Sequence, residues 1–280
     1  MKIAILSGKG GTGKTTITGN LATFLKNCTM IDTDVEEPNS HLFFSMENKK
    51  HEKVYGKVPE IDESKCILCG KCSEFCKYAA LFNTKKSILI FEESCHSCLG
   101  CEIVCDYGAI NFKNREIGEI ISGRNKEMNI FYGKLNIGGL SGVKIINRLK
   151  KITEDEKLLL IDCPPGTSCS TVAAVSDCDF ALVVAEPTPF GVSDLKMVVE
   201  MLKKLKINFG VVINKAGLGN DEIYDYLLEN KITLIEEIPF NEDVAKFYSQ
   251  GKIFLEESEI YAEKFKNIYR KIEVLTNENK

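Results

Sequence analysis

The chain carries, close to its first residues, the segment GKGGTGKT, whose glycines and lysines are spaced to bind nucleotide phosphates. Gly8, Gly13, Lys14 and Thr15 fit the pattern G-x-x-x-x-G-K-[ST], between an apolar run and a helical stretch. Glycines let backbone N–H groups turn towards phosphate oxygens, and the helix N-terminus adds partial positive charge. We expect Lys14 to contact the β and γ phosphates of ATP or ADP, Thr15 to ligate Mg²⁺, and Thr16 to contact the α-phosphate. The nucleotide-binding residues expected here are Gly8, Lys9, Gly10, Gly11, Thr12, Gly13, Lys14, Thr15 and Thr16.

Two apolar runs that follow this loop end in aspartate. IDTDVEEPN places Asp32 and Asp34 after one run, and LLLIDCPPG places Asp162 after another. A carboxylate at the carboxyl end of a strand can hold Mg²⁺ through water, which makes Asp162 a candidate. Each aspartate taken alone could simply cap the next helix. Their order after a phosphate loop favours a catalytic site.

The phosphate loop has a second lysine, Lys9, which an ordinary loop of this kind does not need. KGGTGKTT with this extra lysine resembles the deviant Walker A motif of the MinD/ParA/nitrogenase iron protein class of ATPases. In that class two subunits face each other across two nucleotides, and the extra lysine reaches the partner's phosphates much as an arginine finger does. The resemblance implies a nucleotide-dependent homodimer that is closed through Lys9. A solvated lysine on the rim of the loop is the alternative.

The same resemblance implies roles for the acidic residues and for one asparagine. Asp34 would orient the attacking water, while Asp32 would lie near the Mg²⁺ shell. Asn214, in VINKAG, would contact the adenine base, although a structural asparagine in a turn is the rival interpretation. EPTPFGVSDL (186–195) also resembles this family. The predicted catalytic residues are Lys9, Lys14, Asp34 and Asp162.

Eight of the twelve cysteines form two runs with the spacing C-x2-C-x2-C-x3-C. This spacing lets a turning backbone point thiolates at one iron–sulfur cube, and it matches the bacterial ferredoxin run, whose fourth cysteine ligates the other cluster. The resemblance implies two [4Fe–4S] clusters. The expected ligands are Cys66, Cys69, Cys72 and Cys105 for the first, and Cys95, Cys98, Cys101 and Cys76 for the second. Zinc is the alternative, although a four-ligand zinc site rarely needs such a run twice.

Some cysteine-region residues depart from the ferredoxin pattern or have ordinary roles. The usual proline after the fourth cysteine is Lys77 in one run and Asp106 in the other. His96 is expected to be a surface histidine, because each cluster already has four thiolates. The remaining cysteines adjoin apolar stretches, so we expect core packing for Cys28, Cys163, Cys169 and Cys178.

Alternating apolar runs and helical stretches must position these groups. Strands are predicted at 2–7, 28–32, 158–162, 180–186, 209–214 and 233–240, and a helix at 15–26. This alternation predicts an α/β fold with a mostly parallel, doubly wound sheet covered on both faces. The apolar residues between 260 and 272 have helical spacing, and we expect that helix to dock on the core rather than on a membrane surface.

The alternation stops between about 58 and 114, where the chain contains an internal repeat. KCILCGKCSEFCKYAALF (65–82) aligns with SCHSCLGCEIVCDYGAINF (94–112) at an offset of 29 residues. We predict a P-loop ATPase domain from 1–57 and 115–280, and an inserted, ferredoxin-like α+β domain at 58–114. This arrangement resembles MinD-superfamily ATPases that contain an inserted ferredoxin domain.

Composition excludes several classes of protein. With 280 residues, 44% hydrophobic and 27% charged, the chain has an ordinary globular composition. Its net charge of −4 gives no general attraction to nucleic acid or anionic lipid. No apolar run approaches the ~20 residues of a membrane span. We therefore expect a cytoplasmic protein with reduced cysteines.

Three functions remain open on the sequence. The first is an ATPase that couples dimer closure to electron transfer through two [4Fe–4S] clusters, with a separate redox partner. The second is an ATPase that assembles or inserts an Fe–S cluster or metal cofactor into an apo-target protein. The third, a positioning ATPase like MinD, is disfavoured by the cysteine runs.

Overall fold

The computed structural model describes residues 1–257 and 259–277. Over these residues the main sheet has nine strands in the order β11-β10-β9-β1-β8-β2-β7-β6-β3. Seven neighbouring strands are parallel, from β11 through β7. They are β1 (Lys2–Leu6), β2 (Thr29–Asp32), β7 (Met128–Leu135), β8 (Leu159–Asp162), β9 (Phe180–Ala185), β10 (Phe209–Ala216) and β11 (Leu234–Pro239). The prediction of a mostly parallel α/β sheet is confirmed.

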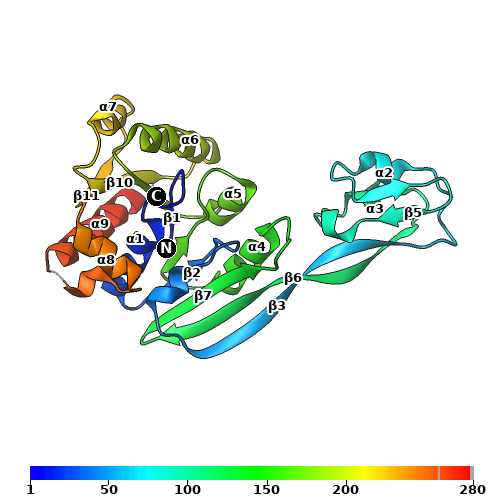
Figure 1. The fold of residues 1–280 in the computed structure, drawn as a ribbon, viewed down its shortest axis with the longest axis horizontal. Coiled ribbons are helices and arrows are strands. Elements are labelled where there is room, and N and C mark those ends of the chain that lie inside the picture. Colours follow the sequence, from blue (N-terminus) through cyan, green and yellow to red (C-terminus); the bar gives the residue numbers. More distant parts are fainter. Residues whose placement is uncertain (258, 278–280) are drawn as a thin grey trace.

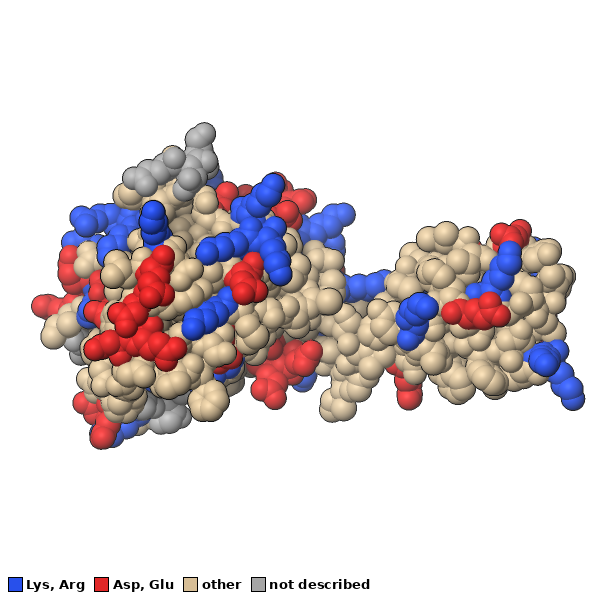
Figure 2. All heavy atoms as spheres, turned by 90° about the horizontal axis from the view of Figure 1, so that it is seen from above, with Lys and Arg blue, Asp and Glu red and all other residues tan. Residues whose placement is uncertain are grey.

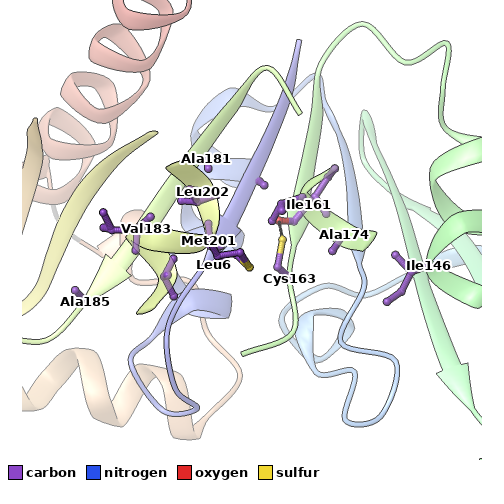
Figure 3. Close-up of a cluster of buried hydrophobic side chains, with 14 of the residues drawn as sticks. Leu6, Ile146, Ile161, Cys163, Ala174, Ala181, Val183, Ala185, Met201 and Leu202 are labelled. Atoms are coloured by element: carbon purple, nitrogen blue, oxygen red, sulfur yellow. Dashed lines mark hydrogen bonds between the residues drawn. The ribbon is translucent and has the colours of Figure 1, made fainter. Parts of the chain in front are cut away.

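Helices cover both faces of this sheet, which is what two separate hydrophobic cores require (Figure 1). One face packs against α4 (Val143–Ile152), α5 (Cys169–Val175), α6 (Pro189–Leu205) and α7 (Glu222–Glu229). The other packs against α1 (Lys14–Leu25), α8 (Glu242–Ser249) and α9 (Glu259–Asn277). Figure 3 shows part of the first core, where Leu6, Ile161 and Leu202 meet between strands and helices. Each such fully buried side chain contributes ~1.5–3 kcal/mol relative to exposure.

The C-terminal helix docks on the core, as its spacing predicts. Phe265, Ile268 and Ile272 of α9 are fully buried against the sheet, whereas Ile260 is exposed. No helix in the described ranges is both long and apolar enough to cross a membrane.

The four scattered cysteines divide into three kinds. Cys28 and Cys163 are buried as predicted, and Cys178 is partly buried against the first core. The prediction is wrong for Cys169, which is exposed. It is the first residue of α5, and the buried residues of that helix are Thr171, Ala174 and Val175.

Two long strands at one edge of the sheet were not predicted. β3 (Glu47–Ile61) and β6 (Ile110–Asn125) pair antiparallel along nearly their whole length, and β6 also pairs antiparallel with β7. The predicted domain limits at 58 and 114 fall inside these strands, which continue through them unbroken. In the sequence, the signal for β3 was a short period-two pattern from Lys53 to Val58, whose residues alternate between exposed and buried in the structure. The many charged residues around this segment obscured the pattern.

Beyond the main sheet, β3 and β6 continue as a twisted two-stranded ribbon that carries a small, separate unit (Figure 1). We call residues 62–109 the cysteine unit. It contains α2 (Lys71–Phe75), α3 (Gly100–Ile103), β4 (Leu81–Asn83) and β5 (Ile88–Ile90). Its Cys72, Leu81 and Cys101 pack together with Ile110 of β6. Its surface carries few charges on the face seen in Figure 2. The elements of the unit therefore form a body apart from the nucleotide-binding sheet.

Candidate nucleotide site and cysteine quartets

The phosphate loop connects β1 to α1 at the carboxyl edge of the parallel strands. Gly13 precedes the helix with φ 89°, and a Cβ there would approach Asn214 Nδ2 to 2.3 Å. A Cβ at Gly8 would approach Asp194 Cβ to 2.4 Å, so glycine is required at both positions. A Cβ at Gly10 or Gly11 would meet open space, because this side of the loop faces the cavity.

A cavity of about 390 Å³ lies over this loop. Its walls combine the loop and the start of α1 with Asp34, Asn214 and Lys215, and with apolar residues that include Phe240 and Phe254. This mixture of inward-facing backbone, cations and an apolar wall suits a nucleotide, whose phosphates need N–H donors and whose base needs apolar surface.

Lys14 is held at the bottom of the site by an ion pair with Asp162, Nζ to Oδ1 3.1 Å. Burial alone would lower the pKa of Lys14, but the carboxylates of Asp162, Asp32 and Asp34 outweigh burial and raise it. The hydroxyl of Thr18, a residue not predicted from the sequence, lies 3.2 Å from the same oxygen of Asp162.

The other oxygen of Asp162, Oδ2, is buried and has no hydrogen-bond partner within the described residues. An unsatisfied buried carboxylate oxygen is costly. A hydrated Mg²⁺ held between Asp162 and the Thr15 hydroxyl would satisfy it, so this donor set fits the expected metal.

Asp32 and Asp34 stand at the end of β2 in different surroundings. Asp32 is fully buried and accepts backbone N–H bonds from Asp34, Asn39 and Ser40 at 3.0 Å each. Burial, with the nearby charge of Asp162, raises the pKa of Asp32 to about 7. Asp34 faces the cavity, and burial raises its pKa as well. Asp32 thus shapes the loop from 33 to 40, whereas Asp34 is available to a ligand.

Lys9 is not solvated alone on the rim. Its Nζ lies 3.2 Å from Glu186 Oε2 of the same chain, and Glu186 also pairs with Lys215. Burial raises the pKa of Glu186, but the two lysines outweigh burial and lower it overall. Glu186 follows β9, and Lys215 is the second-last residue of β10 at the same edge of the sheet. The sequence analysis did not single out either as a site residue. Reach across a dimer stays a prediction for Lys9.

Asn214 lies under the phosphate loop and also lines the cavity. Its Nδ2 donates to the carbonyl of Thr12 at 2.7 Å, while Lys215 Nζ donates to the carbonyl of Gly11 at 3.0 Å. These bonds brace the outer turn of the loop from below. They favour the structural role for Asn214, and its contact with adenine stays a prediction.

Replacing Asn214 separates the two roles. We expect Asn214→Ala to weaken binding of ATP and of inorganic tripolyphosphate by the same factor, ~5–10-fold, because one loop-bracing hydrogen bond is lost. Titration calorimetry with both ligands measures this. A loss confined to ATP would instead assign Asn214 to the base, and Asn220→Ala, outside the cavity, is the control.

The cysteine unit contains two hollows, each lined by four cysteines. One, of about 20 Å³, is lined by Cys66, Cys69, Cys72 and Cys105. The other, of about 250 Å³, is lined by Cys76, Cys95, Cys98 and Cys101. Each hollow therefore combines three cysteines of one run with the fourth of the other, in the groups that the ferredoxin run implies. We call them the Cys66 quartet and the Cys95 quartet.

Electrostatic contacts within the unit follow the same grouping. Burial raises the pKa of Cys72, and the thiols of Cys66 and Cys105 add to this shift. Burial raises the pKa of Cys101 to about 11, with additions from Cys95 and Cys98. No group of three or more His, Cys, Asp or Glu residues in the described ranges is arranged to hold a single metal ion. Which metal or cluster the quartets bind therefore stays a prediction.

His96 stacks on Tyr78 with ring centroids 3.7 Å apart, beside the Cys95 quartet. His96 is half-buried, and its role as a surface histidine rather than a ligand stays a prediction.

Comparison with known proteins supports the nucleotide site. Residues 3–254 match the CobQ/CobB/MinD/ParA nucleotide binding domain. An uncharacterized protein of Methanocaldococcus jannaschii is 32% identical over 95% of this chain and 97% of its own length. The iron-sulfur cluster carrier protein of Clostridium perfringens is 25% identical over 95% of this chain and 86% of its own. The cell division ATPase MinD of Pyrococcus furiosus has a similar fold, with a TM-score of 0.60 and 21% identity over 98% of both chains. The chain therefore belongs to the CobQ/CobB/MinD/ParA nucleotide-binding family and is an ATPase with the fold of MinD.

Proposed function

We propose that this ATPase couples nucleotide-driven dimer closure to electron transfer through two [4Fe–4S] clusters in the cysteine unit. The observation that carries the proposal is the pair of hollows in one small unit, each lined by four cysteines in the crossed grouping. Four thiolates are a complete ligand set for such a cluster. Each cluster, when bound, supplies a one-electron redox centre.

At the nucleotide, the proposal gives each side chain a defined task. Lys14 neutralises charge on the β and γ phosphates, and Thr15 with Asp162 holds Mg²⁺. Asp34, half-buried and facing the cavity, orients the attacking water. Lys9 of the partner subunit stabilises charge on the transferred phosphate. Asp32 fixes the backbone of the loop that carries Asp34.

The link between the two sites is mechanical. β2, which ends in Asp32, pairs with β7, β7 pairs with β6, and β6 with β3 leads into the cysteine unit. A movement of the loop after β2 would therefore displace β7 and, through it, β6 and β3, which lead into the cysteine unit.

A second candidate, delivery of a cluster to an apo-target protein, is favoured by the relative that is an iron-sulfur cluster carrier protein. Its weakness lies in the ligands. With four cysteines around each hollow and Cys72 and Cys101 buried, this unit is built to retain clusters rather than to release them.

Anaerobic reconstitution followed by EPR-monitored redox titration, with and without Mg·ATP, tests the proposal. We expect about eight irons per chain and a potential of at least one cluster that shifts when Mg·ATP binds. Transfer of iron to an apo-ferredoxin on ATP addition would favour delivery instead. Protein that binds nucleotide but holds no iron would overturn both.

A further inference from the structure

We infer that the Cys95 quartet is the nucleotide-sensitive one of the two, and that Arg115 is the positioning residue that makes it so. This inference rests on the proposed function, because it concerns clusters held by the two quartets.

Arg115 of β6 binds the turn that carries Cys95. Its Nη2 donates to the carbonyl of Cys95 at 3.0 Å, and its Nη1 donates to the carbonyl of Glu92 at the start of the short 3-10 turn Glu92–Ser94. One guanidinium thus bridges both ends of the turn and fixes it to the ribbon. It also places a permanent positive charge beside the quartet.

The backbone just after Arg115 is bonded to the loop that follows β7. Asn136 donates its N–H to the carbonyl of Ile117 at 3.0 Å and its Nδ2 to the carbonyl of Glu116 at 3.3 Å. These two bonds hold the loop after β7 against β6, within two residues of Arg115.

The same loop is bonded to the segment that contains Asp34. The N–H of Leu135 donates to the carbonyl of Val35 at 2.8 Å. Val35 is buried, and it packs so closely that a Cβ at Gly142 would approach its Cγ2 to 2.1 Å. A shift of Asp34 and Val35 on nucleotide binding therefore cannot occur without moving the loop from 135 to 142.

A cavity of about 230 Å³ lies between the Cys95 turn and the loop after β7, so these two segments can shift relative to each other. It is lined on one side by Cys95, His96 and Arg115 and on the other by the loop residues from Leu135 to Ser141. The lining of the Cys66 hollow, by contrast, comes entirely from residues between Ile61 and Ile110. Cys95 is thus the quartet member that shares a cavity with the ATPase part of the chain.

A lysine of the cysteine unit supplies a control for charge. Lys86 carries the same charge as Arg115 but is an exposed residue of the turn between β4 and β5.

A positive charge beside a cluster favours its reduced, more negative form. We expect Arg115→Gln to lower the midpoint potential of one cluster and leave the other unchanged. The cluster affected is expected to be the one whose potential responds to Mg·ATP in the unaltered protein, and its response to nucleotide is expected to fall to less than half. Arg115→Lys, which keeps the charge but cannot bridge two carbonyls in the same way, should restore the potential more than the response.

The measurement is an EPR-monitored redox titration of the full-length protein, with and without Mg·ATP, with iron content as a check on folding. Lys86→Gln should leave both potentials and the response unchanged. The inference is overturned if both clusters of the unaltered protein respond equally, or if Arg115→Gln changes the cluster that does not respond. Protein without iron would instead overturn the proposed function itself. Iron content therefore distinguishes failure of the proposed function from failure of the inference about Arg115.

Discussion

Lys9→Ala is expected to abolish the ATP-dependent dimer and to lower ATP turnover by at least ~100-fold, since a cation supplied in trans to a transferred phosphate is worth 10³–10⁵ in related enzymes. ATP affinity of the single chain should change little, because Lys14 and the loop backbone remain. Light scattering with Mg·ATP, phosphate release and titration calorimetry measure the three quantities.

If Lys9 acts on the nucleotide of a second chain, Glu186 is the residue that holds it before the dimer closes. The ion pair from Lys9 to Glu186 is partly exposed on the lysine side, with 36% of that side chain accessible, and such pairs are worth about 0–1 kcal/mol. Lys215 also pairs with Glu186, so the buried carboxylate keeps a cation when Lys9 leaves. A triphosphate on the facing subunit can therefore compete for Lys9 at small cost.

Glu186→Gln is the companion variant. It removes the intrachain partner but leaves Lys9 in place, so we expect dimerisation at equal or lower ATP concentration than in the unaltered protein. Lys9→Ala that turns over ATP normally as a monomer would contradict the trans role. That result would favour the alternative interpretation, in which Lys9 is a solvated lysine on the rim of the phosphate loop.

The sequence predicts well those parts of the fold whose signal lies within a few consecutive residues. The phosphate loop and the apolar runs of the parallel strands are local patterns, because a buried strand must be apolar along its whole length. The strand at 158–162, for example, lies where predicted, and Asp162 ends it at the site.

The parts that were missed depend on pairing between distant segments. β3 and β6 are rich in charged residues because most of their length forms an edge or an open ribbon, so they lack the continuous apolar run of a buried strand. Glu186 and Lys215 become site residues only because β9 and β10 are neighbours that end beside the loop. Glu186 and Lys215 are 29 residues apart in the sequence, so no short sequence pattern predicts the ion pair between them.

Cys105→Ala is expected to remove the cluster of the Cys66 quartet, although Cys105 belongs to the run that starts at Cys95. Iron content should fall from about eight to about four per chain. The physical reason is the hollow itself, since Cys105 lines it together with Cys66, Cys69 and Cys72. A cluster with three thiolates in a partly open hollow is exposed to loss.

Spectra of four single variants decide whether ligation is crossed. The EPR signal that remains in Cys105→Ala should match that of Cys66→Ala, and the signal that remains in Cys76→Ala should match that of Cys95→Ala. If Cys105→Ala instead matches Cys95→Ala, each run serves its own cluster. Crossed ligation has a mechanical consequence, because loss of either fourth cysteine then also cuts the tie between the two halves of the repeat.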